Sequence, residues 1–255
     1  MIITILGSGT CVPSLKRSSC AVLVQCDRHN LLFDCGSGTI RRLLECEIEI
    51  FDISHIFLSH FHPDHSGELP AFLFANKYPD KQRRRIPLNL VGGKGLNRFY
   101  KGLLNTWGKW IELPFEKFTM IELDNTGKDS YDFNLFRVFT APVAHNEESI
   151  AYRVTDSKGC TVVYSGDTDE SENLVKLAEN ADIFICESAM PDGHKIKGHL
   201  TPSAAGAIAH KANVKKLVLT HFYPECDQSD VETQCRKTWA GPLVLAHDLM
   251  TVECG

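Results

Sequence analysis

The chain has 255 residues, of which 43% are hydrophobic and 23% charged, and its formal net charge is -5. A chain of this length can bury a core without disulfides or a structural metal, so any metal site would serve function. The negative charge excludes a global basic field that captures nucleic acid, and the short apolar N-terminal stretch fits neither a signal peptide nor a membrane span. We therefore expect a cytoplasmic protein that does not enter a membrane.

Short apolar runs separated by polar loops predict strands and helices along the whole chain. Ser171 and the pair Thr201–Pro202 mark helix starts. Mixed strands with helices outside them predict an α/β (α+β) fold of stacked sheets, and no linker divides the sequence, so residues 1–255 are expected to form a single domain. The expected strands are Met1–Leu6, Ala21–Gln25, Asn30–Phe33, His55–Leu58, Leu88–Gly92, Phe118–Glu122, Phe133–Pro142, Ser149–Thr155, Cys160–Ser165, Ile183–Glu187, Leu217–Thr220 and Val244–Ala246. The expected helices are Gly38–Cys46, Leu69–Asn76, Gly95–Trp107, Ser171–Glu179, Thr201–Lys211 and Asp230–Thr238.

The ten cysteines show no CxxC spacing, so neither a zinc ribbon nor a thioredoxin-like motif is indicated. Several lie in apolar runs, as Cys186 does. We therefore expect reduced, buried thiols that pack as small hydrophobic side chains.

The segment HFHPDHSG, which begins at His60, carries the strongest chemical signal. His60 and His62 stand two apart at the end of a strand and so face the same way, while Pro63 turns the chain and redirects Asp64 and His65. Three imidazoles and a carboxylate are costly to bury without a cation. The alternative is a His-rich surface loop, but the apolar strand before the segment favours a metal site.

Three later polar residues follow the same pattern. His145, Asp167 and His221 each stand just after an apolar run, where open α/β sheets place their sites. Each of them, taken alone, fits a structural role, and for a lone histidine that role is the more common one. Together with His60–His65 they predict one metal centre.

These segments resemble the metallo-β-lactamase superfamily over nearly the whole chain: HFHPDHSG, His145, SGDT at 165–168 and THF at 220–222. The resemblance implies a four-layer αβ/βα sandwich with two metal ions at one edge, zinc being favoured and manganese or iron the alternatives. By position, it implies that the first metal is bound by His60, His62 and His145, the second by Asp64, His65 and His221, and that Asp167 bridges both.

Within that superfamily, the segments LGSGTCVPS at 6–14, LFDCGSGT at 32–39 and GHLT at 198–201 are similar to the ribonuclease Z group. This resemblance implies that His199 acts near the scissile phosphate, that Glu187 orients it, and that Asp34 supports a metal-bound histidine. The catalytic group is then Asp64, Asp167, His199 and Glu187.

One departure from that group limits the choice of substrate. Ribonuclease Z enzymes typically carry a tRNA-gripping arm between the segments that match His145 and Asp167. Only 21 residues separate these positions here, and they fit two strands and a turn. The missing arm argues against tRNA 3′-end processing and leaves smaller phosphodiesters and other esters open.

We therefore expect a metal-dependent hydrolase, foremost a phosphodiesterase acting on nucleic acid such as RNA or on a small phosphodiester. The alternative is a carboxyl-ester, thioester or lactone hydrolase on the same metals, and a third class is a non-catalytic metal-binding protein. Many members of the superfamily are dimers, so the resemblance also implies that this chain forms a homodimer.

Two basic segments are weaker candidates for substrate contact. A stretch after the helix expected at Leu69–Asn76 either guides an anionic substrate or forms a solvated loop. This stretch comprises Lys77, Lys81, Arg83, Arg84 and Arg85. The other segment, Lys16 and Arg17, follows the ribonuclease-Z-like start and is a candidate for phosphate contact.

Overall fold

Two seven-stranded β-sheets form the centre of the computed structural model, which describes residues 1–80 and 83–254. The first sheet has the order β14 (Met250–Glu253), β1 (Ile2–Gly7), β2 (Ala21–Cys26), β3 (His29–Phe33), β4 (Ile53–Leu58), β5 (Leu88–Gly93), β6 (Phe118–Leu123). The second has the order β13 (Leu243–Leu245), β12 (Leu217–Thr220), β11 (Ile183–Glu187), β10 (Thr161–Tyr164), β9 (Ile150–Asp156), β8 (Phe136–Pro142), β7 (Asp129–Asp132). Both sheets mix parallel and antiparallel pairs.

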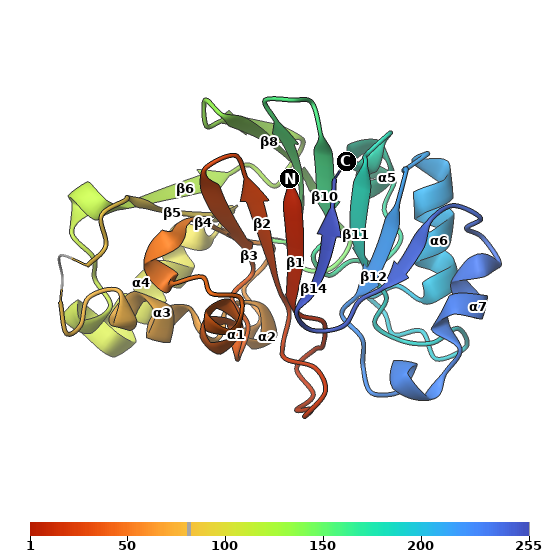
Figure 1. Ribbon diagram of the computed structural model, residues 1–255, viewed down its shortest axis with the longest axis horizontal. Helices are drawn as coiled ribbons and strands as arrows, with labels where there is room; N and C mark the ends of the chain where they lie inside the picture. The colour runs from red at the N-terminus through yellow and green to blue at the C-terminus, as the bar shows by residue number, and fades with distance from the viewer. Residues whose placement is uncertain (81–82, 255) are drawn as a thin grey trace.

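Helices cover the outer face of each sheet. Those on the first sheet are α1 (Thr39–Glu45), α2 (Pro63–Ser66), α3 (Leu69–Ala75) and α4 (Leu96–Trp107), and those on the second are α5 (Glu172–Ala178), α6 (Pro202–Lys211) and α7 (Val231–Arg236). Figure 1 shows the two groups on opposite sides of the paired sheets. The expected four-layer αβ/βα arrangement is therefore confirmed. Within the described residues, every helix is too short or too polar to cross a bilayer.

The alternation of side chains along the strands builds two hydrophobic cores. In β2, Val22 and Val24 join the core between the sheets, whereas Leu23 joins the core beneath the helices of the first sheet. In β3, Phe33 and Leu32 divide in the same way. A strand with a period of two can serve both faces only when both are covered, which explains why these runs are continuously apolar.

The helix starts follow the capping rules. The Ser171 hydroxyl accepts a hydrogen bond from the backbone of Leu174, and the Thr201 hydroxyl accepts one from Ala204 with Pro202 at the first helical position. These side chains satisfy backbone N–H groups that have no partner inside the helix. Both predicted helix starts are confirmed.

Several elements differ from the expectation, including the short helix α2, where only a turn at Pro63 was expected. The strand expected at 133–142 begins only at Phe136, because Phe133 and the left-handed Asn134 form the turn of the β7–β8 hairpin. Strand β7 itself is polar, so no apolar alternation marks it. Strand β14 was also missed, although it pairs antiparallel with β1 at the opposite end of the chain.

The expectation of reduced thiols is wrong for Cys160 and Cys254, which form a disulfide across 94 residues of sequence. The pairing of β14 with β1 brings Cys254, whose backbone donates to Met1, toward the start of β10. The other eight cysteines are free, and Cys11 is the exposed one among them.

The basic stretch is tied to its surroundings. Arg84 is only 1% exposed, and its guanidinium donates to the carbonyls of Ile50 (2.5 Å) and Ile53 (2.8 Å). Arg83 pairs with Glu49. A solvated loop is therefore the wrong description of Arg84, which holds neighbouring backbone carbonyls together, while Lys81 lies outside the described residues.

His55 makes stability depend on pH. It is 4% exposed and packs edge-on against Phe133 and Phe136. Burial, with a smaller contribution from His29, lowers the pKa of His55 from 6.5 to about 3. The unfolded chain therefore takes up a proton below pH 6.5 that the folded chain refuses, so stability falls as the pH drops from 6.5 toward 3.

Replacing His55 with Gln removes this dependence. Between pH 7 and pH 4, we expect the variant to lose about 3 kcal/mol less of its free energy of unfolding than the unchanged protein. Urea unfolding at both pH values measures the difference. The same substitution at the exposed His247 is the control. Equal losses for the His55 variant and the unchanged protein would contradict the burial argument.

Candidate metal centre

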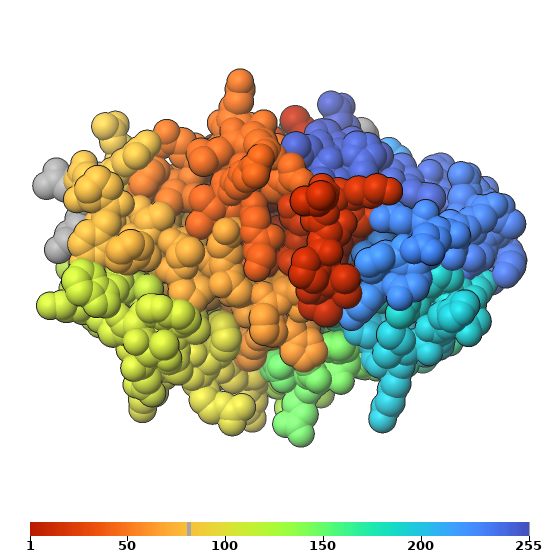
Figure 2. Space-filling view, turned by 90° about the horizontal axis from the view of Figure 1, so that it is seen from below, coloured from red at the N-terminus to blue at the C-terminus, as the bar shows by residue number. Residues whose placement is uncertain are grey.

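The candidate residues meet at one edge of the paired sheets. The segment after β4 contributes His60 to His65, the segment after β8 contributes His145, and the ends of β10 and β12 contribute Asp167 and His221. Figure 2 views this edge from below, where the N-terminal loop (red) packs beside the blue segment that follows β12. Residues distant in sequence therefore converge because neighbouring strands end there.

Local backbone geometry presents the first cluster. His62 precedes α2, whose first residue Pro63 suits a helix start, and Asp64 and His65 lie in that single turn. Gly36 packs against it so closely that a Cβ atom would stand 2.1 Å from the carbonyl oxygen of Asp64. A side chain at position 36 would therefore displace the turn that carries Asp64 and His65.

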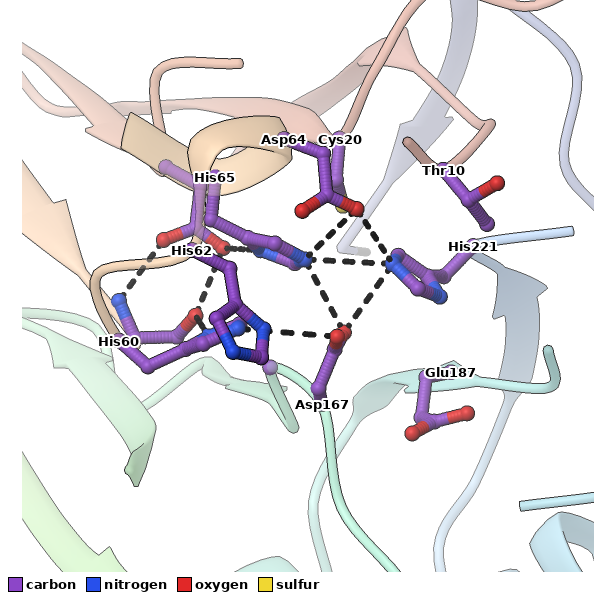
Figure 3. A network of polar contacts seen from close by, with 12 residues as sticks. Thr10, Cys20, His60, His62, Asp64, His65, Asp167, Glu187 and His221 are labelled. Atoms are coloured by element: carbon purple, nitrogen blue, oxygen red, sulfur yellow. Dashed lines mark hydrogen bonds and ion pairs between the residues drawn. The ribbon is translucent and has the colours of Figure 1, made fainter. Parts of the chain in front are cut away.

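Asp167 faces two groups of histidines at once (Figure 3). Its Oδ1 lies 3.2 Å from Nε2 of both His65 and His221. Its Oδ2 lies 3.7 Å from Nε2 of His60 and 3.9 Å from Nε2 of His145. Ligand atoms fall into compact groups, each within 4.8 Å: His60, His62, His145 and Asp167; Asp64, His65 and His221; and Asp167, His199 and His221.

Buried atoms in this cluster lack hydrogen-bond partners. Nε2 of His60, Oδ1 of Asp167 and Nδ1 of His221 are buried without one in the described structure. Burial, followed by the neighbouring His65, holds the pKa of His60 well below its usual range, so its imidazole is neutral. Unsatisfied buried lone pairs are costly, and a divalent cation would satisfy those that point inward. The donor set therefore fits a divalent metal.

Most candidate histidine ligands have a polar contact at the ring nitrogen that points away from the candidate metal centre. A metal-binding histidine is commonly oriented by a contact at its other nitrogen. The pairs are His60 Nδ1 with Ser59 Oγ (3.0 Å), His62 Nε2 with the Asn146 side-chain amide (3.1 Å), His65 Nδ1 with Asp34 Oδ2 (2.7 Å) and His145 Nδ1 with the Gly198 carbonyl (2.9 Å). Ser59 and Asn146 were missed from the sequence, although each is the immediate neighbour of a candidate ligand.

Asp34 is the centre of this supporting network. It is fully buried and accepts hydrogen bonds from the backbone and hydroxyl of Ser59 (2.7 and 2.8 Å) and from the Tyr164 hydroxyl (2.6 Å). Tyr164 belongs to β10 of the second sheet, whereas Asp34 follows β3 of the first. The orientation of His65 therefore depends on both sheets.

The partly buried His199 pairs with the buried Glu187 beside Asp167. His199 Nδ1 lies 3.0 Å from Glu187 Oε1 and 3.9 Å from Asp167 Oδ2. Burial opposes protonation, but the contact with Glu187 outweighs it and raises the pKa of His199. Glu187 is fixed in turn by the backbone N–H groups of Thr168 (2.8 Å) and Leu200 (3.0 Å). The contact with Glu187 thus uses Nδ1 of the imidazole and leaves Nε2 outside the pair.

The expectation of phosphate contact fits Arg17 poorly. Its guanidinium donates to Ser8 Oγ (2.7 Å) and the Ala246 carbonyl (2.8 Å), and pairs with Asp227 (2.7 Å). It also lies 4.8 Å from the ring centre of Phe222. Arg17 therefore anchors the N-terminal loop, while Lys16 stays exposed.

Known proteins share this fold and are similar in sequence over most of the chain. Ribonuclease Z of Methanothermobacter thermautotrophicus is 27% identical, with 99% of this chain and 96% of the relative covered. An uncharacterized protein of Mycobacterium bovis, Mb1374, is 30% identical, with 94% and 88% covered. The human short-form tRNase Z superposes with a TM-score of 0.81 at 26% identity, with both chains covered completely.

The metallo-β-lactamase fold protein YhfI of Bacillus subtilis superposes with a TM-score of 0.82 at 22% identity and 99% coverage of both chains, which shows the same fold. The predicted superfamily and its similarity to ribonuclease Z are therefore confirmed. A family model described as Anti-Pycsar protein Apyc1 matches residues 1–238. The chain, built on a metallo-β-lactamase fold, belongs to the Anti-Pycsar protein Apyc1 family.

Proposed function

We propose that this chain is a phosphodiesterase that uses two metal ions, zinc foremost. The observation that carries the proposal is the placement of the Asp167 carboxylate, with one oxygen toward His65 and His221 and the other toward His60 and His145. One carboxylate between two nitrogen-rich groups suits a pair of cations. The first site would use His60, His62, His145 and Asp167, and the second Asp64, His65, His221 and Asp167.

Imidazole and carboxylate ligands favour zinc, and they also accept manganese or iron. Two bound cations would supply Lewis-acid chemistry, polarising a phosphoryl oxygen and lowering the pKa of water. Within this proposal, the Asp64 and Asp167 carboxylates hold the attacking water and accept its proton.

The proposed general acid is His199. Glu187 engages Nδ1 of its imidazole at 3.0 Å and favours the charged imidazole, which carries protons on both nitrogens. The Nε2 proton of the charged form is then available to the leaving oxygen, and its charge stabilises the phosphorus-bound oxygens. Glu187 acts through His199 and is therefore a positioning residue.

The substrate we propose is a short or small phosphodiester. The described interval from His145 to Asp167 is filled by β9, β10 and their turn, so this part of the chain holds no arm. The similarity to ribonuclease Z and to the human tRNase Z supports a nucleotide-type substrate, with short RNA and cyclic nucleotides as the candidates. A single domain over residues 1–255, a cytoplasmic location and a homodimer stay predictions.

Hydrolysis of bis(p-nitrophenyl) phosphate tests the proposal. We expect turnover by zinc- or manganese-loaded protein and loss of turnover in a His62→Ala variant, because that imidazole would be a ligand. Nitrophenolate absorbance gives the rate, and metal analysis confirms loading. If protein that holds two metals per chain hydrolyses only a lactone or a thioester, the phosphodiesterase proposal is wrong and the carboxyl-ester alternative takes its place.

A further inference from the structure

Tyr223 and His199 are both partly exposed, and we call this solvent-facing side of the candidate metal centre its mouth. The ring centre of Tyr223 is 6.3 Å from that of His221 and 6.4 Å from that of His199, and the ring stands nearly perpendicular to both. These two imidazoles are themselves stacked 5.6 Å apart. The backbone N–H of Tyr223 donates to the Ala189 carbonyl, which anchors the backbone that carries the ring. The ring therefore borders the space in front of the proposed general acid.

The hydroxyl of Tyr223 has a weak partner. Its oxygen lies 3.5 Å from Sγ of Cys11, and among the described residues this is the hydrogen bond that the hydroxyl makes. A thiol is a poor donor and a poor acceptor, so the phenol keeps its capacity for a stronger hydrogen bond. A tyrosine that only packed would more commonly turn its hydroxyl to a backbone or carboxylate acceptor.

The loop that carries Cys11 is held in place. Arg17 ties it to Ala246, and the Ser8 carbonyl accepts from the backbone of Phe222, the neighbour of Tyr223. Residues 8–18 and the segment after β12 thus form one wall, which Figure 2 shows as red atoms beside blue ones. Because Cys11 is exposed, this wall is open to solvent at the thiol.

We propose that Tyr223 contacts the substrate and that its hydroxyl donates a hydrogen bond to an oxygen of the phosphodiester. Cys11 keeps the phenol aimed at the mouth until the substrate replaces this weak contact. The ring supplies an apolar wall beside the leaving group or the base of a nucleotide. The identity of the substrate rests on the proposed function, whereas the location of Tyr223 at the mouth does not.

Tyr223→Phe removes only the hydroxyl. We expect kcat/KM for bis(p-nitrophenyl) phosphate to fall about 10- to 100-fold, as for a lost hydrogen bond to a charged group, with the metal content unchanged. Tyr131→Phe, at an exposed tyrosine on β7, is the matched control and keeps the rate of the unchanged protein. Unchanged kinetics in Tyr223→Phe would overturn the proposed hydrogen bond.

A second measurement does not depend on turnover. Cys11 in the metal-loaded protein is alkylated with N-ethylmaleimide, and the rate is followed by mass spectrometry with and without 5′-AMP, a product-like nucleotide. We expect 5′-AMP to slow alkylation in the unchanged protein and to protect less in Tyr223→Phe, with Cys11→Ser identifying the labelled site. Equal alkylation rates with and without 5′-AMP would show that Tyr223 and Cys11 do not border the bound nucleotide. Absent turnover of every phosphodiester, with protection intact, would instead defeat the proposed phosphodiesterase function alone.

Discussion

Asp167→Asn is expected to lower the metal content from about two ions per chain to one or fewer and to reduce kcat/KM for a phosphodiester by at least about 10³-fold. The amide keeps the shape of the carboxylate, so the loss reports charge and bridging rather than packing. The Asp167 carboxylate lies within 4 Å of four candidate ligand nitrogens. Both sites should therefore weaken together.

Metal analysis after gel filtration and calorimetric zinc titration measure this effect. Asp132→Asn is the matched control, because Asp132 lies on β7 and is exposed, paired with Arg137. Circular dichroism establishes that the Asp167 variant is folded. If that folded variant kept two tightly bound ions, Asp167 would not bridge and the proposed division of the ligands would fail.

His199→Ala is expected to lower kcat about 10²- to 10⁴-fold, as for the loss of a general acid, while both metal ions stay bound. The geometry raises a competing role, because His199 shares a compact group with Asp167 and His221. Loss of one metal ion in the variant would make His199 a ligand.

Glu187→Gln tests whether Glu187 acts through His199. It leaves a hydrogen-bond acceptor near His199 but removes the charge that favours the imidazolium. We expect a smaller loss of kcat than in His199→Ala, and in the double variant a loss no greater than that of His199→Ala alone, since Glu187 acts through His199. Additive losses would show that Glu187 acts independently.

The sequence predicted the candidate ligands but missed the supporting contacts that depend on packing. His60 and His62 stand two apart at a strand end, so their common direction follows from strand geometry alone. The contact of Asn146 with His62 joins residues that only the packed sheets bring together. Apolar alternation revealed the central strands, but the polar β7 lies at the edge of its sheet and carries no such signal.

The disulfide and the buried arginine were missed for a related reason. Cys254 meets Cys160 only because β14 pairs with β1, and this pairing joins the two ends of the chain. Arg84 carries a charge that composition assigns to the surface, yet it serves the carbonyls of Ile50 and Ile53. Neither long-range pairing nor unmet backbone acceptors can be read from local sequence.

The division of the candidate ligands between the two halves of the chain has a consequence for biosynthesis. His60 to His65 leave the ribosome early, but Asp167 and His221 follow more than a hundred residues later. The Asp34–Tyr164 hydrogen bond that helps to orient His65 also requires both sheets. A growing chain therefore presents only four of the seven candidate ligands, so tight binding of the proposed metal pair would wait until the sheets have docked. Under this proposal, metal retention would measure completed folding, and truncated chains would release their metal.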